Sequence, residues 1–211
     1  MNIHKETLLL YAVTDRSHLE GLYLSEAVEE AIKGGVTCVQ LREKHLSDEA
    51  LLAEAKAVKE VTDHYQVPLI INDRVDIALS IDADGVHIGQ KDGSVREARQ
   101  ALGPCKILGV TARTVEQATN AQAQGADYLG VGAMFPSSTK DDATVTPRET
   151  VRAIAQAVSL PFVVIGGINQ TNIKELKSLG AAGAALVSAI FSGDNCYENA
   201  RNLRVLCEEV F

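Results

Sequence analysis

The sequence contains no tryptophan, and its four cysteines are spaced without a CxxC or CxxH pair. In a chain of 211 residues this spacing offers neither a zinc site nor a disulfide framework, so we expect the cysteines to be small buried side chains. The GxSxG and HExxH motifs of serine and zinc hydrolases are also missing. These absences leave covalent acyl transfer and zinc hydrolysis with little support.

No apolar run approaches the ~20 residues that a membrane-spanning helix requires, and even AAGAALVSAIF is much shorter. The first residues, MNIHKETLLLYAVTDR, lack the long apolar segment and the small-residue cleavage site of a signal peptide. We therefore expect a cytoplasmic protein that has no membrane partner.

A basic stripe is lacking as well, and the formal net charge is -8. This charge argues against nucleic acid as the main partner. An anionic ligand would have to be held by a local cluster of cations and backbone N–H groups, because the overall field of the protein repels it.

Strand and helix patterns alternate along the whole chain. The apolar runs that indicate strands are LLLYAVTD, VTCVQLREK, LIIND, GVHIG, KILGVTA, ADYLGVGAMF, LPFVVIGGI and AALVSAIF. Amphipathic segments between them indicate helices, including SDEALLAEAKAVKEVTDHY, with Ser47 or Asp48 as N-cap, and NQTNIKELKSLG before the last strand. Eight such units predict an α/β fold, a single-domain (β/α)₈ TIM barrel over residues 1–211. An open doubly wound sheet would usually carry a GxGxxG turn after its first strand, and that turn is missing.

Two neighbouring strands of this barrel end in acidic residues. Asn72 and Asp73 follow the run LII, and Gln90 and Asp92 follow GVHI. Because the carboxyl ends of parallel strands meet at one face, we expect the two carboxylates to lie close together, where they repel each other unless a cation separates them. Mg²⁺ commonly takes one or two carboxylates plus substrate phosphate. The structural alternative is that Asp73 caps the next helix and that Asp92 only forms a turn.

Other strand ends carry residues suited to anion binding. Gly166 and Gly167 follow the seventh strand, where barrel enzymes commonly bind phosphate with backbone N–H groups, although they could also form only a tight turn. Lys44 and Lys140 beside the aspartates suggest a second anion site, and two sites imply two phosphorylated ligands. His87 is the one histidine inside a predicted strand, where it either points into the barrel or is a hydrogen-bonded core residue.

The sequence resembles the thiamine phosphate synthase family over nearly its whole length. The matching motifs, in order, are YAVTD (11–15), QLREK (40–44), IIND (70–73), GVHIGQKD (85–92), STK (138–140), IGGI (165–168) and VSAIF (187–191). Seven motifs in register make this a specific match.

The resemblance implies a small barrel transferase that joins 4-amino-2-methyl-5-(diphosphomethyl)pyrimidine to 4-methyl-5-(2-phosphoethyl)thiazole, or its carboxylate form, and releases diphosphate. It implies that Asp73 and Asp92 bind Mg²⁺ and act in catalysis with Lys140. The contacts to the pyrimidine diphosphate would come from Gln40, Leu41, Arg42, Glu43, Lys44, Asn72, Thr111 and Lys140. The thiazole phosphate would be bound by Ser137, Ser138, Thr139, Gly167, Val187 and Ser188.

Two rival functions stay open at this point. A thiazole tautomerase of the same superfamily would keep the glycine-rich phosphate site but would not need Asp73, Asp92 and Lys140 together. A non-catalytic sensor of thiamine precursors is the other, although no appended interaction segment is evident. The sequence leaves the oligomeric state open, a homo-oligomer included.

Overall fold

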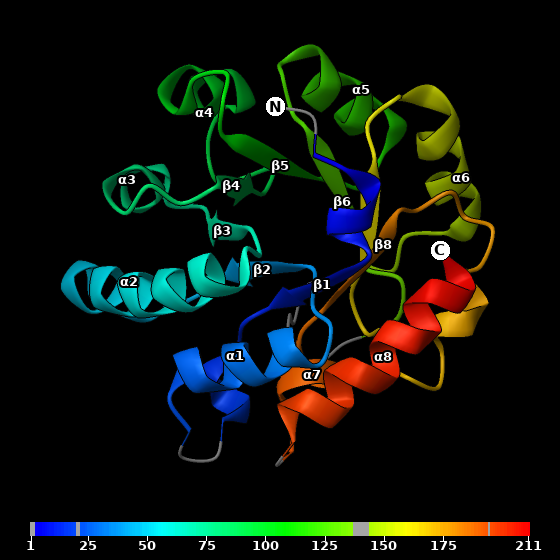
Figure 1. The fold of residues 1–211 in the computed structure, drawn as a ribbon. Coiled ribbons are helices and arrows are strands. Elements are labelled where there is room, and N and C mark those ends of the chain that lie inside the picture. The colour runs from blue at the N-terminus through cyan, green and yellow to red at the C-terminus, as the bar shows by residue number, and fades with distance from the viewer. Residues whose placement is uncertain (1–2, 20–21, 137–143, 194) are drawn as a thin grey trace.

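Eight parallel strands close into one barrel in chain order, and β8 pairs with β1 to complete it (Figure 1). The computed structural model describes residues 3–19, 22–136, 144–193 and 195–211. The strands are β1 (Leu10–Val13), β2 (Cys38–Leu41), β3 (Leu69–Asn72), β4 (Gly85–Ile88), β5 (Ile107–Ala112), β6 (Tyr128–Gly132), β7 (Phe162–Ile165) and β8 (Gly183–Leu186). The predicted (β/α)₈ barrel is thereby confirmed.

Helices surround the strands, as Figure 1 shows. They are α1 (Leu24–Lys33), α2 (Asp48–Tyr65), α3 (Val75–Ser80), α4 (Val95–Leu102), α5 (Val115–Ala123), α6 (Arg148–Ala157), α7 (Ser188–Phe191) and α8 (Cys196–Val210), with 3₁₀ turns η1 (Lys5–Leu8), η2 (Arg16–His18) and η3 (Ile173–Leu176). Several helices begin at an N-cap residue. The side chains of Ser47, Ser94 and Thr114 accept a backbone N–H from the first turn of α2, α4 and α5, respectively.

Two predicted elements near the C-terminus differ from the structure. The eighth strand stops at Leu186, and SAIF forms the short helix α7, whose last carbonyls accept hydrogen bonds from the Asn199 side chain of α8. NQTNIKELKSLG forms only η3, because Lys177 returns to an extended conformation and Ser178 has a φ of 66°. The expected burial of cysteine holds for Cys38, Cys196 and Cys207, whereas Cys105 is exposed.

The barrel has two apolar layers. One fills the space between strands and helices, and the other, which includes Tyr11, Cys38, Ile70, Ile107 and Tyr128, fills the barrel interior. Alternate residues of each strand face the interior. Polar residues in this inward register near the strand carboxyl ends therefore face a common space above the core.

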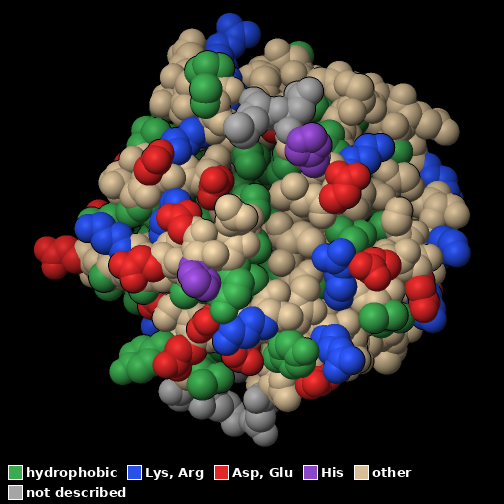
Figure 2. Space-filling model, viewed as in Figure 1, with side chains coloured by type: hydrophobic (Ala, Val, Ile, Leu, Met, Phe, Trp, Pro, Cys, Tyr) green, Lys and Arg blue, Asp and Glu red, His purple; other side chains and the backbone are tan. Residues whose placement is uncertain are grey.

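The exposed surface shows mixed charge. On the face drawn in Figure 2, acidic and basic side chains are interspersed. Within the described part of the chain, none of the helices combines the length and apolar character needed to cross a membrane.

Close packing at the barrel centre predicts a graded sensitivity to an added methyl group. A Cβ on Gly109 would overlap the ring of Tyr128, whereas a Cβ on Gly130 would lie 3.0 Å from His87 Cε1. We expect Gly109→Ala to lower the free energy of unfolding by about 2–3 kcal/mol and Gly130→Ala by about 1 kcal/mol, because overpacking forces neighbours off their rotamers. Urea unfolding measures both, and equal losses would show that Tyr128 yields freely.

Candidate active site

A cavity of about 140 Å³ opens at the carboxyl ends of the strands. It has residues from all eight strands or the segments that follow them in its wall, as the phosphate-binding faces of parallel barrels do. The predicted residues that line it are Gln40, Arg42, Asn72, Thr111, Gly166, Gly167, Val187 and Ser188. Residues from strand ends that are distant in the sequence therefore lie around one cavity, whereas Lys44, Asp73 and Asp92 are not among its lining residues.

A hydrogen-bonded chain forms the floor of the cavity. Gln40 Nε2 donates to Tyr11 Oη at 2.8 Å, and Tyr11 Oη lies 2.8 Å from Tyr128 Oη. His87 Nδ1 lies 3.0 Å from Tyr128 Oη, and His87 Nε2 lies 3.0 Å from Thr111 Oγ1. Burial raises the pKa of both tyrosines well above the ordinary value, so their hydroxyls stay neutral. His87 thus points into the barrel and is also hydrogen-bonded at both ring nitrogens. The two alternatives that the sequence left open for His87 are therefore both true.

The alternation of β2 divides the QLREK segment between two sides of the strand. Gln40 and Arg42 line the cavity, whereas Leu41 packs in the layer between strands and helices. The Glu43 side chain is also turned away from the cavity and is only 6% exposed. The resemblance implied that Leu41 and Glu43 contact the pyrimidine diphosphate, but in this structure neither side chain lines the cavity.

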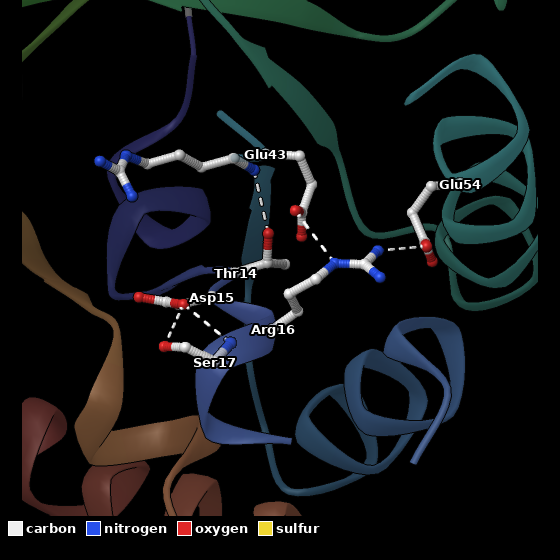
Figure 3. Close-up of polar contacts among 7 residues, drawn as sticks. Thr14, Asp15, Arg16, Ser17, Glu43 and Glu54 are labelled. Atoms are coloured by element: carbon white, nitrogen blue, oxygen red, sulfur yellow. Dashed lines mark hydrogen bonds and ion pairs between the residues drawn. The ribbon is translucent and has the colours of Figure 1, made fainter. Parts of the chain in front are cut away.

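Glu43 instead holds two loops together (Figure 3). Arg16, which follows β1, donates Nε to Glu43 Oε2 at 3.1 Å and Nη2 to Glu54 Oε2 of α2 at 2.6 Å. Thr14 Oγ1 accepts the backbone N–H of Arg42 at 2.9 Å, which adds a second link between the same loops. Burial raises the pKa of Glu43, and the Arg16 charge opposes that rise. The second oxygen, Oε1, is buried and accepts no hydrogen bond among the described residues.

Asp73 and Asp92 are brought together where β3 and β4 end. The Asp73 N–H donates to the His87 carbonyl at 2.9 Å, and the left-handed φ of 63° at Asp73 turns the chain away from the strand. The pKa of Asp73 is raised, first because burial desolvates the carboxylate, and then because Asp92 acts on it through its charge and a side-chain hydrogen bond. Lys44 and Asn72, whose Nδ2 donates to Asp73 Oδ2 at 2.6 Å, act in the opposite direction.

The sequence also left open that Asp73 only caps a helix and that Asp92 only forms a turn. The N-cap of α3 is Arg74 and has no side-chain cap, so Asp73 does not cap that helix. Asp92 Oδ2 accepts the Gly89 N–H at 3.0 Å, so Asp92 closes a turn and also faces Asp73.

The acidic pair fits a divalent cation with oxygen ligands. Asp73 is half-buried and Asp92 is exposed, and the Asp92 charge adds to the rise in the pKa of Asp73. A cation between the two carboxylates would therefore stabilise the pair. Within the described ranges, no group of three or more His, Cys, Asp and Glu side chains could hold a metal ion. The pair suits Mg²⁺, which keeps several water or phosphate ligands, better than a closed zinc site.

A glycine turn after β7 contributes backbone to the cavity wall. Gly166 and Gly167 follow β7 with φ of 99° and 66°, and a Cβ on Gly167 would lie 2.5 Å from the Pro136 carbonyl oxygen. The Asn172 side chain donates to the Gly167 carbonyl at 2.9 Å and fixes the turn. The glycines therefore form a tight turn and also border the cavity, as do Val187 and Ser188, which follow β8.

Some predicted residues fall outside the described chain, and some lining residues were not predicted. Ser137, Ser138, Thr139 and Lys140 lie in the undescribed range 137–143. Tyr11 begins the YAVTD motif but was given no role in the site, and Tyr128 and Arg113 belong to the site but to no motif considered in the sequence. Arg113 could have been found, because it stands two residues after Thr111 and so shares its inward register.

A parallel barrel whose strand ends carry an acidic pair, and whose cavity is lined by arginines and a glycine turn, defines a class of enzyme that binds phosphorylated small molecules. Residues 10–190 match a sequence model described as thiamine monophosphate synthase. The chain belongs to this family, which confirms the resemblance read from its motifs.

Individual relatives agree with that assignment. The thiamine-phosphate synthase of Clostridium tetani is 49% identical over 201 residues, 95% of this chain and 93% of that protein. That of Clostridioides difficile is 52% identical over 191 residues, 90% of this chain and 91% of that protein. The solved structure of thiamine phosphate pyrophosphorylase from Pyrococcus furiosus superposes with a TM-score of 0.89 at 36% identity and covers 98% of both chains.

The contact between the two carboxyls predicts how the pKa of Asp73 responds to its neighbour. Asp92→Asn should lower the pKa of Asp73, because one of the two largest causes of its rise is removed. A raised folded-state pKa makes the folded protein gain stability as pH falls through that pKa, so this gain should shrink in the variant. Carboxyl ¹³C NMR titration measures the pKa directly, and an unchanged value would show that the two groups are not in contact.

Arg16 predicts a pH-dependent stability. Arg16→Gln leaves the buried Glu43 carboxylate without its cation, and we expect a loss of about 1–2 kcal/mol near neutral pH, at the low end for an unpaired buried charge because Arg16 is partly exposed. The pKa of Glu43 should rise further, so protonation should relieve the loss as pH falls through it.

Urea unfolding at about pH 8 and about pH 5 tests this expectation. The double variant Arg16→Gln/Glu43→Gln serves as the control, because it has no buried charge and should show a loss that does not depend on pH. An equal loss in Arg16→Gln at both values would argue against the pairing.

Proposed function

We propose that this chain joins 4-amino-2-methyl-5-(diphosphomethyl)pyrimidine to 4-methyl-5-(2-phosphoethyl)thiazole, giving thiamine phosphate and diphosphate. The carboxylate form of the thiazole, whose carboxyl group would leave as CO₂, is included in the proposal. The observation that carries it is the pairing of Asp73 with Asp92 beside Asn72, a residue that lines the same cavity as the glycine turn. The names and sequences of the relatives support the same reaction.

Two sets of residues divide the substrates between them. Gln40, Arg42, Asn72 and Thr111 come from β2, β3 and β5 and offer amide, guanidinium and hydroxyl groups to the pyrimidine diphosphate, with Lys44 close to Asp73. Gly167, Val187 and Ser188 offer backbone N–H groups and a hydroxyl to the thiazole phosphate. Ser137, Ser138, Thr139 and Lys140 are proposed to complete these sites from the segment after β6.

Asp73 and Asp92 would hold Mg²⁺. When bound, the ion would offset the negative charge that develops on the departing diphosphate. The raised pKa of Asp73 fits this role, because a carboxylate that is costly to ionise alone is stabilised most by a cation.

The side chains of the cavity suit a dissociative substitution. The bond between the pyrimidine methylene carbon and the diphosphate oxygen breaks with its electron pair on oxygen, and the thiazole nitrogen then donates a pair to that carbon. Arg42, Lys44 and Lys140 would stabilise the leaving anion, with Lys140 placed by the family resemblance. No strong base is needed, which agrees with a His87 ring that is hydrogen-bonded at both nitrogens. Cytoplasmic location, the absence of a nucleic-acid or membrane partner, and a homo-oligomeric state stay predictions.

The rival functions use less of this site. A tautomerase that binds only thiazole phosphate gives no reason for two carboxylates to be kept in contact beside Lys44. A sensor would bind both precursors and release no diphosphate.

Asp92→Asn tests the division of the site. Diphosphate release from the two substrates with Mg²⁺ should fall on the order of 10²-fold or more, since stabilisation of the leaving charge is lost. Binding of the thiazole phosphate, measured by calorimetry, should be unchanged, because its proposed site is the turn at Gly166 and Gly167.

Asp82→Asn is the matched control, since it removes the same charge from an exposed residue. Asp82 precedes β4 and pairs with Lys106. Equal loss of turnover and thiazole binding in Asp92→Asn would contradict the division. If the wild-type protein releases no diphosphate, one of the rival functions is favoured. Binding of the pyrimidine diphosphate would then indicate a sensor, and its absence would indicate a tautomerase.

A further inference from the structure

Arg113 is a cation of the cavity to which no role has been given. It follows β5 directly and lines the cavity. Thr111, two residues earlier, faces inward and contacts His87, so the alternation of the strand gives Arg113 the same inward direction. Its backbone is fixed there, because the Arg113 N–H donates to Gln117 Oε1 of α5 at 2.7 Å.

The Arg113 guanidinium makes no ion pair or side-chain hydrogen bond with the residues that the structure describes, although Arg113 is half-buried. Elsewhere, half-buried arginines are paired, as Arg99 is with Asp127 at 2.5 Å. Arg42, which also lines the cavity, is half-buried and unpaired among the described residues in the same way. A desolvated guanidinium is stabilised by a partner, and in a cavity that partner is an anionic ligand.

The strand order places these two arginines on either side of the acidic pair. Arg42 follows β2, Asp73 follows β3, Asp92 follows β4 and Arg113 follows β5, and these four strands are neighbours in the barrel. The Asp92 loop is tied to the end of β5, because Gln90 Nε2 donates to the Thr111 carbonyl oxygen at 2.6 Å. By contrast, β6 separates Arg113 from the glycine turn.

We propose that Arg113 binds the diphosphate, from the side opposite Arg42. A diphosphate that shares a divalent cation with Asp73 and Asp92 would then meet one guanidinium on each flank. Planar guanidinium groups donate two parallel hydrogen bonds to phosphoryl oxygens, which lysine cannot do. The identity of this anion rests on the proposed function, but the contact itself is testable without turnover.

Calorimetric titration of the full chain with inorganic diphosphate and Mg²⁺ tests the proposal. Arg113→Gln should weaken diphosphate binding about 10- to 100-fold, as expected for loss of charge-assisted hydrogen bonds, and Arg113→Lys should recover part of the affinity. Binding of the thiazole phosphate should not change. Circular dichroism of both variants confirms that they fold.

Arg152→Gln, an exposed residue on α6, is the matched control, because it makes the same change in net charge far from the cavity. It should leave diphosphate binding unchanged. Equal weakening in both variants would assign the effect to the overall field and overturn the proposal, as would normal diphosphate binding in Arg113→Gln. Loss of thiazole phosphate binding in its place would overturn it too. A failure of the proposed function would show instead as absent turnover with diphosphate binding still dependent on Arg113.

Discussion

The repulsion between Asp73 and Asp92 is the constraint on which the site depends. The fold brings the two carboxyls together through the continued pairing of β3 with β4, where the Asp73 N–H reaches the His87 carbonyl. It then holds Asp73 in a left-handed conformation that a non-glycine residue adopts at a cost. Burial and, after it, the charge of Asp92 raise the pKa of Asp73, so ionising this carboxylate in the folded state is unfavourable. Such strain is typical of sites in which a ligand supplies the missing partner.

The surroundings of this pair are unusually well fixed. Below it, the chain from Gln40 through Tyr11, Tyr128 and His87 to Thr111 fills the barrel with neutral polar groups that satisfy one another. Beside it, the ion pairs of Arg16 hold the loops that carry Arg42 and Lys44. Hydroxyls, and the loops that carry the cations, are thus positioned before a ligand arrives, which is how electrostatic stabilisation becomes effective.

The sequence predicted the barrel and most strand ends, because apolar runs and inward register are local properties. It failed at SAIF, where apolar residues typical of a strand form α7, since the contacts of Asn199 with that turn come from a distant helix. The family resemblance assigned Glu43 to the substrate, and that assignment stays a prediction, since the side chain pairs with Arg16 in this structure. The partnership of Tyr11 with Tyr128, 117 residues apart, depends on barrel closure and leaves no local pattern.

The most direct test of the account is the position of a divalent ion. Mn²⁺ accepts the same oxygen ligands as Mg²⁺ and gives an anomalous X-ray signal. In crystals grown with Mn²⁺ and diphosphate, the account predicts the anomalous peak between the carboxyl groups of Asp73 and Asp92, joined to them directly or through water. A peak elsewhere, with those two carboxyls free of the ion, would contradict it.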